Sequence, residues 1–254
     1  MSELPVRRIV DDAAAAAIAT AELVIAAAQH AVDERGVFHL CTTGGSTPAA
    51  LYAALREPDR AARMPWGATQ IWFGDDRHVP RTSPLSNLAP LDAVLLARDS
   101  HGVTSPIGND QVHPWPTDED GPKAVSDYLA AARAAKIQHT PEGFPQFDLV
   151  LIGIGGDSHC LSVFPGSPLT SSSAPVAAPV SAPTHIEPHV PRLSFSLGLL
   201  SAARAVCATV VGAGKSAALA RIFNGEGSVS EVPAKAALTS TATWIIDHAA
   251  AADL

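Results

Sequence analysis

Short runs of β-branched and aromatic residues alternate along this chain with longer segments rich in alanine and leucine. The runs are too short for helices and are bounded by glycine and polar residues. Five of them are predicted as strands, at Val37–Cys41, Gln70–Phe73, Phe147–Ile152, Ala205–Val211 and Thr243–Ile246. This alternation predicts an α/β fold with an open, mainly parallel sheet flanked by helices.

Helix signals occupy the segments between these strands. A long helix is predicted from Asp11 to Val32, because the two aspartates at its start can cap an alanine-rich stretch. A second helix is predicted over Ala49–Arg56, with Thr47 as its N-cap and Pro48 in its first position.

The chain shows no change of composition that would mark a domain boundary, so we predict one domain over residues 1–254. The segment at about residues 165–191, called the excursion below, is rich in Pro, Ser and Ala. Such a segment is typically a functional lid or a surface excursion, and a short strand at Val176–Val180 fits inside it.

The formal net charge of -8 argues against a nucleic-acid partner or an anionic membrane, since both require a basic surface. A few local cations can still bind a phosphorylated small molecule. The three cysteines have no paired spacing, which indicates a reducing compartment. Without a signal pattern before the first helix, the sequence predicts a cytoplasmic protein.

Four of the predicted strands end in loops rich in glycine and polar residues. These loops are Thr42–Pro48, Gly74–His78, Gly153–His159 and Gly212–Lys215. In open α/β sheets the ligand lies beyond the carboxyl ends of the strands. We therefore expect one site to which all four loops contribute.

The segment Gly44-Gly45-Ser46-Thr47 lies where a strand is followed by a helix, so its backbone N–H groups can face an anion. The alternative is a tight turn without a ligand. Nucleotide motifs are not supported. A P-loop ending at Lys215 would need a glycine where Thr209 stands, and a dinucleotide fingerprint would need one at Ser158.

Two cations stand near strand ends. Arg77 follows Asp75 and Asp76, and its planar guanidinium suits a phosphate or carboxylate. The alternative is a surface ion pair of little energetic value. Lys215 is either a second anion ligand or a solvated helix lysine.

His159 follows a glycine-rich strand exit, and Asp157 lies two residues before it. A histidine there can accept a proton near neutral pH, although most lone histidines are structural. His185 and His189 are four residues apart, but the prolines around them exclude a zinc-binding helix face. With no Cys/His cluster and no nucleophile elbow, neither a metal nor a nucleophilic serine is expected.

These loops, in this order, resemble the 6-phosphogluconolactonase family, which shares its fold with glucosamine-6-phosphate deaminases and ribose-5-phosphate isomerases. The resemblance rests on Leu40–Pro48, Phe73–Pro80 with Ser86-Asn87, Gln111–Pro114, Phe147–Gly155 followed by Asp157–His159 and Phe164–Gly166, Pro191–Ser194 and Gly212–Lys215. It implies a Rossmann-like topology. Deaminases typically continue after the histidine with Phe-Asn-Glu-Pro, whereas this chain has the lactonase form Val163-Phe164-Pro165-Gly166.

The resemblance implies hydrolysis of 6-phospho-D-glucono-1,5-lactone to 6-phospho-D-gluconate in the oxidative pentose phosphate pathway, without a metal or other cofactor. His159 would activate the attacking water, with Asp157 beside it. The expected partner is then a small-molecule lactone. The protein is expected to be a monomer or a weak homodimer. The residues implied to bind the substrate and its phosphate are Gly44, Gly45, Ser46, Thr47, Asp76, Arg77, Arg192 and Lys215.

Some positions depart from the family pattern. Ser158 stands where the family usually has glycine, so strain is expected if its φ is positive. Glu187 stands where a lysine is common, which would reverse a charge near the phosphate. These changes leave an alternative, a catalytically weakened sugar-phosphate-binding homologue. A glucosamine-6-phosphate deaminase-like enzyme is a more distant one.

Overall fold

The computed structural model describes residues 4–97 and 105–254 of the chain. Seven parallel strands form one sheet in the order β1-β10-β9-β6-β2-β3-β5. Their bounds are β1 (Val6–Val10), β2 (Phe38–Thr42), β3 (Thr69–Phe73), β5 (Val112–His113), β6 (Leu149–Ile152), β9 (Val206–Val210) and β10 (Ala242–Asp247). The predicted parallel α/β sheet is confirmed.

A second, antiparallel sheet contains β4 (Asp75–Arg77), β8 (Arg192–Phe195) and β7 (Ala177–Val180), in the order β4-β8-β7. The short strand expected inside the excursion is therefore present as β7. Residues 75–77 were expected in a loop, and that expectation is wrong. A three-residue polar strand has no periodicity to detect, and it forms here because β8, more than a hundred residues later, pairs with it.

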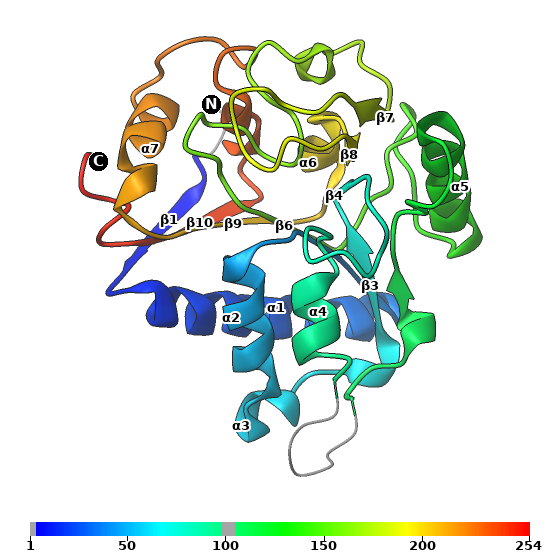
Figure 1. The fold of residues 1–254 in the computed structure, drawn as a ribbon. Coiled ribbons are helices and arrows are strands. Elements are labelled where there is room, and N and C mark those ends of the chain that lie inside the picture. The colour runs from blue at the N-terminus through cyan, green and yellow to red at the C-terminus, as the bar shows by residue number, and fades with distance from the viewer. Residues whose placement is uncertain (1–3, 98–104) are drawn as a thin grey trace.

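Helices cover the large sheet on both faces. Figure 1 shows α1, α2 and α4 together on one side and α6 and α7 on the other, while α5 packs against β7 and β8. The α-helices are α1 (Ala13–Arg35), α2 (Ser46–Arg56), α3 (Pro58–Ala61), α4 (Ala89–Val94), α5 (Gly121–Ala134), α6 (Gly198–Ala202) and α7 (Ser216–Phe223). The short 3-10 helices are η1 (Trp66–Ala68), η2 (Asn109–Gln111), η3 (Pro168–Thr170), η4 (Ala213–Lys215) and η5 (Pro233–Ala237).

The long helix α1 begins after Asp12, whose carboxylate accepts a hydrogen bond from the N–H of Ala15 at 2.8 Å. By length and composition alone, α1 is apolar enough to cross a membrane, but half of its apolar window is buried inside this structure. Its buried face packs on β2, β9 and β10. It is therefore part of the core of this structure.

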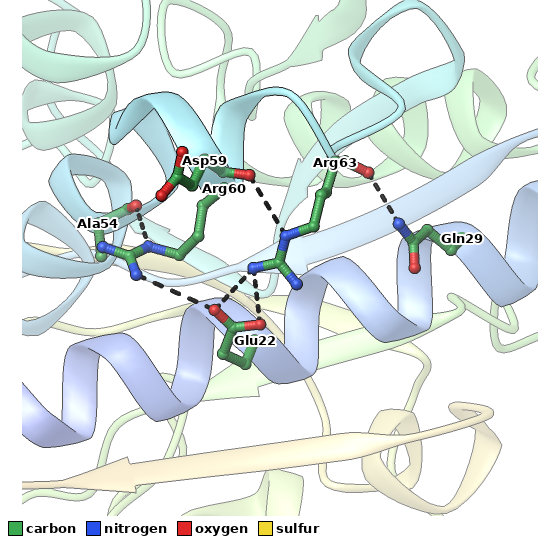
Figure 2. Close-up of polar contacts among 6 residues, drawn as sticks. All are labelled: Glu22, Gln29, Ala54, Asp59, Arg60 and Arg63. Atoms are coloured by element: carbon green, nitrogen blue, oxygen red, sulfur yellow. Dashed lines mark hydrogen bonds and ion pairs between the residues drawn. The ribbon is translucent and has the colours of Figure 1, made fainter.

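A polar cluster fixes α3 against α1 (Figure 2). Each carboxylate oxygen of Glu22 on α1 lies 2.8 Å from the Nη2 atom of Arg63, which follows α3. Gln29, two turns further along α1, donates to the backbone oxygen of Arg63 at 3.0 Å. Because α3 directly follows α2, these contacts hold the C-terminal end of α2 while its N-terminus points to the carboxyl edge of the sheet.

Gly74 joins the two sheets. Its N–H donates to the oxygen of Thr42 at the end of β2, and its oxygen accepts from the N–H of Phe195 on β8. A β-carbon at this position would lie 2.6 Å from Leu161 Cδ2. The side chain of Leu161 would have to shift to admit a larger residue here, and Gly74 leads directly from β3 into β4.

The start of α2 differs from the expectation. The N-cap is Gly45, with φ of 100°, and the helix begins at Ser46 rather than Pro48. Proline is still tolerated, because N–H groups of the first turn have no acceptor inside the helix.

One hydrophobic cluster extends through both sheets. The single-domain organisation stays a prediction.

Candidate active site

A cavity of about 300 Å³ opens at the carboxyl edge of the large sheet, and we call it the strand-end cavity. All four glycine-rich strand exits contribute to it, as the sequence predicted. Its lining residues are Thr43, Gly44, Gly45, Thr47, Asp75, Arg77, Asn87, Gly153, Ile154, Gly155, His159, Leu161, Ile186, Arg192, Thr209, Val210, Val211 and Lys215.

The N-terminus of α2 faces this cavity. Gly45 and Thr47 line it, and within the described residues no side chain caps the first turn of the helix. The free N–H groups and the helix dipole therefore favour an anion. Ser46 is the first residue of the same turn.

Close packing against Asn87 restricts position 44 to glycine, in addition to the backbone N–H groups that this loop exposes. A β-carbon there would lie 2.0 Å from Asn87 Oδ1, so the side chain of Asn87 occupies the space that any other residue would need. The Asn87 amide nitrogen donates to the backbone oxygen of Asp75 at 2.8 Å. The first glycine of the loop thus serves packing, and the second, with open space around it, serves the turn.

Arg77 and Arg192 lie directly opposite each other on β4 and β8. Their guanidinium hydrogen bonds go to backbone carbonyls, from Arg77 to Leu85 and from Arg192 to Pro188 and Val190. The Nε atom of Arg77 is buried without a partner. Burial and then the charge of Arg77 lower the pKa of Arg192. Like charges placed opposite each other are unfavourable, so this pair favours an anion between them.

Lys215 adds a third cation from η4, at the exit of β9. It lines the cavity and is half-buried. Among residues 4–97 and 105–254, its ammonium group has no hydrogen-bond or ion-pair partner. The geometry thus brings Arg77, Arg192 and Lys215 to the same cavity, although each stands at the end of a different strand or just beyond it.

Asp76 does not line the cavity but bonds to two residues that do, Arg77 and Asn87. It is fully buried and accepts hydrogen bonds of 2.7 Å from the N–H groups of Arg77 and Asn87. Burial raises the pKa of Asp76 to about 6, and the nearby Asp75 carboxylate adds to the rise, although these hydrogen bonds oppose it. Asp76 therefore positions the Arg77 backbone and is not itself a ligand of the cavity.

His159 and Asp157 are in direct contact. The Nδ1 atom of His159 lies 2.6 Å from Asp157 Oδ1, and the His159 ring lines the cavity. Gly155 makes this possible, because a β-carbon there would lie 2.1 Å from His159 Nδ1. An ionised carboxylate only accepts hydrogen bonds, so Nδ1 carries the proton and Nε2 is left as a base.

Comparison with known proteins shows the family. Residues 11–246 match the family model described as glucosamine-6-phosphate isomerases/6-phosphogluconolactonase. The chain belongs to this family. A 6-phosphogluconolactonase from Synechocystis sp. is 32% identical, over 88% of each chain. One from Streptomyces coelicolor is 30% identical, over 100% of this chain and 96% of its own.

Solved structures show the same fold. The 6-phosphogluconolactonase from Trypanosoma cruzi superposes with a TM-score of 0.84, over 100% of this chain and 98% of its own. Its sequence is 23% identical to this one, so this likeness speaks for the fold alone. The Rossmann-like arrangement implied by the sequence is confirmed.

Ser158, the departure from the family glycine, has the expected strained backbone. Its φ is 72°, and its side chain is fully buried with a hydroxyl that has no partner. Its N–H and oxygen still bond Gly155 and Ala234. The loop therefore keeps the conformation that a glycine would adopt, at an energetic cost, and His159 still meets Asp157.

Glu187, the second departure, does not line the cavity. Its side chain is 79% exposed and pairs with His189 Nε2 at 3.1 Å. Ile186 lines the cavity instead. The carboxylate therefore remains in water, and the expected charge reversal near the phosphate stays a prediction.

Sequence reasoning gave some residues of the site no role, although Asn87 stands in the Ser86-Asn87 element of the resemblance. Asn87 and Thr209 line the cavity, and His185 on the excursion bonds Asp157 Oδ2 at 2.9 Å. His185 was considered only as a metal ligand, and among the described residues no group of metal-ligating side chains is present. Its contact with Asp157 depends on how the excursion folds back, which spacing cannot show.

Replacing Asp76 by asparagine should change how stability depends on pH. Folding raises the pKa of Asp76 from 3.8 to about 6, so the folded protein binds this proton more tightly than the unfolded chain. Wild-type stability therefore falls as the pH rises through this window. As the pH rises from about 4 to about 6, the free energy of unfolding of Asp76→Asn should increase by up to roughly 3 kcal/mol relative to that of the wild type. Urea unfolding across the window measures this, with the exposed Asp118→Asn as control. A difference that stays constant with pH contradicts the assignment.

Replacing Ser158 by glycine should stabilise the protein. Glycine adopts positive φ without the penalty of a β-carbon, and the unpartnered hydroxyl disappears. We expect the free energy of unfolding to rise by about 1–2 kcal/mol. Ser158→Ala removes the hydroxyl but keeps the strain, so its gain should be smaller. If glycine is no better than alanine in chemical denaturation, the backbone is not strained.

Proposed function

We propose that the protein hydrolyses 6-phospho-D-glucono-1,5-lactone to 6-phospho-D-gluconate, the hydrolytic step of the oxidative pentose phosphate pathway. One observation carries the proposal. A base, His159, shares a single cavity with an uncapped helix N-terminus and three cations. The family and its lactonase relatives, similar along almost the whole chain, support the same activity.

The cationic half of the cavity suits the phosphate. The guanidinium groups of Arg77 and Arg192 and the ammonium of Lys215 offer charged donors, and the first turn of α2 adds backbone N–H groups. Among the described residues, carboxylate groups do not neutralise these cations through ion pairs. A phosphate at this end would place the rest of a sugar lactone toward His159.

The chemistry needs one base and no cofactor. His159 Nε2 takes a proton from a water whose oxygen attacks the lactone carbonyl carbon, and a tetrahedral oxyanion forms. Backbone N–H groups of the glycine loops are the candidate donors to that oxyanion. As the intermediate collapses, the bond to the ring oxygen breaks and His159 returns the proton to it. Asp157 holds the imidazole in the required tautomer throughout.

The alternative of a weakened, binding-only homologue rests on Ser158 and Glu187. The structure favours the enzyme, because the His159–Asp157 contact is intact and Glu187 faces solvent. The deaminase-like alternative is less favoured by Phe164-Pro165-Gly166 after the histidine. We further propose that the protein acts in the cytoplasm on a small-molecule substrate, as a monomer or weak homodimer.

Phosphate recognition can be tested with two lactones. Arg77→Ala and Lys215→Ala should each raise KM for the phosphorylated lactone by about 10- to 100-fold, since a charged hydrogen bond is worth roughly 1.5–3 kcal/mol. Unphosphorylated glucono-1,5-lactone should be a poor substrate, and its kcat/KM should change little in these variants. Lys123→Ala, which removes an exposed lysine on α5, is the matched control. Equal losses with both lactones would show that the cations do not bind phosphate.

The base can be tested with His159→Asn, which keeps a donor toward Asp157 but cannot accept a proton near neutral pH. We expect kcat to fall by about 10²–10⁴, with KM nearly unchanged. Initial rates with freshly generated lactone, corrected for spontaneous hydrolysis, measure this, and the exposed His248→Asn is the control. Near wild-type turnover by the folded His159→Asn variant would exclude His159 as the base.

A further inference from the structure

The carboxylate of Asp157 is held between two imidazole rings. Oδ1 lies 2.6 Å from His159 Nδ1, and Oδ2 lies 2.9 Å from Nε2 of His185. His159 belongs to the same loop as Asp157, whereas His185 belongs to the excursion. Since an ionised carboxylate only accepts hydrogen bonds, both imidazoles donate to it. The two contacts therefore fix the tautomers of both histidines.

The ring of Phe164 contacts this loop, the excursion and β8. Its centroid lies 4.7 Å from that of His159 and 5.6 Å from that of His185, to which it is nearly perpendicular. On β8, the guanidinium carbon of Arg192 lies 5.8 Å from the same centroid. Phe164 is almost fully buried, so His185 rests against a fixed surface as well as bonding Asp157.

Both donors from His159, its ring Nδ1 and its backbone N–H at 3.1 Å, reach Oδ1, so without a donor on Oδ2 the carboxylate is held through one oxygen only and can still turn about its terminal bond. A donor on the second oxygen removes this freedom, and the imidazole bonded to the first oxygen is then held as well. The side chain of Asp157 is only 20% exposed, so water has limited access as a substitute donor. Burial acts to raise the pKa of Asp157, but the hydrogen bonds from His159 and His185 outweigh it and keep the carboxylate ionised.

We propose that His185 is a positioning residue for lactone hydrolysis, which through Asp157 holds His159 with its Nε2 atom directed at the attacking water. The proposal rests on the proposed function, in which His159 is the base. It gives the excursion a definite role, because folding the excursion onto the site completes the support of the base. His185 itself does not line the cavity.

The kinetic test uses His185→Ala and His185→Gln. Alanine removes the donor, whereas the amide nitrogen of glutamine can take the place of Nε2. We expect His185→Ala to lower kcat roughly tenfold with KM within about twofold, since the base keeps one of its two supports. His185→Gln should recover most of the loss. His189→Ala, on the same excursion, is the control for general loosening, because its partners are Pro183 and Glu187.

A double-variant cycle separates positioning from an independent effect. If His185 acts through Asp157, Asp157→Ala/His185→Ala should be no slower than Asp157→Ala alone. Multiplied losses, a loss confined to KM, or an unchanged His185→Ala would each overturn the proposal.

A measurement independent of turnover keeps this proposal distinct from the proposed function. Long-range ¹H–¹⁵N NMR of the wild type should show His159 protonated at Nδ1 and His185 at Nε2. His185→Ala should broaden or shift the His159 signals, and His189→Ala should not. If the wild type fails to hydrolyse the lactone, the proposed function fails, and these spectra still decide whether His185 holds Asp157. A His185 ring protonated at Nδ1 alone would overturn the contact itself.

Discussion

The carboxylate of Asp75 connects the parts of the site that lie far apart in the chain. Asp75 belongs to β4, two residues before Arg77, and its Oδ2 accepts a hydrogen bond of 2.6 Å from Ser162. Ser162 lies three residues after His159, in the loop that follows β6. Asp75 is 4% exposed, and its carboxylate can be buried because Ser162 and Asn87 donate to it. The strand that carries a phosphate-facing cation and the loop that carries the base are thereby fixed relative to each other.

The sequence predicted those parts of the fold that carry their own local signal. The strands at Phe38–Thr42, Leu149–Ile152 and Val206–Val210 are short, wholly buried and followed by glycine, so pattern and turn chemistry agree. The edge strand Val6–Val10 was missed because most of its residues are exposed and no apolar pattern marks it. The two-residue β5 is too short for any period.

The residues of the site also fall into those with a local sequence signal and those without one. His159 and the glycine loops stand at strand exits, where topology alone predicts a ligand. Arg77 faces Arg192 only because β4 pairs with β8, and Ser162 reaches Asp75 across 87 positions. Such contacts depend on the packing of two sheets, which no local pattern contains. The resemblance to the lactonase family supplied Arg192, but it could not supply His185, whose partner is known only once the excursion is folded.

The opposed arginines concentrate positive charge at one end of the cavity. Backbone carbonyls accept hydrogen bonds from both guanidinium groups and so hold Arg77 and Arg192 on their neighbouring strands. Under the proposed function, a phosphate monoester binds between them only in the folded protein. Ligand at about 100 times its dissociation constant then adds roughly 2.7 kcal/mol to the folded state. The lifetime of this protein in a cell would thus follow the supply of its own substrate and product, with flux through the reaction protecting the catalyst from unfolding.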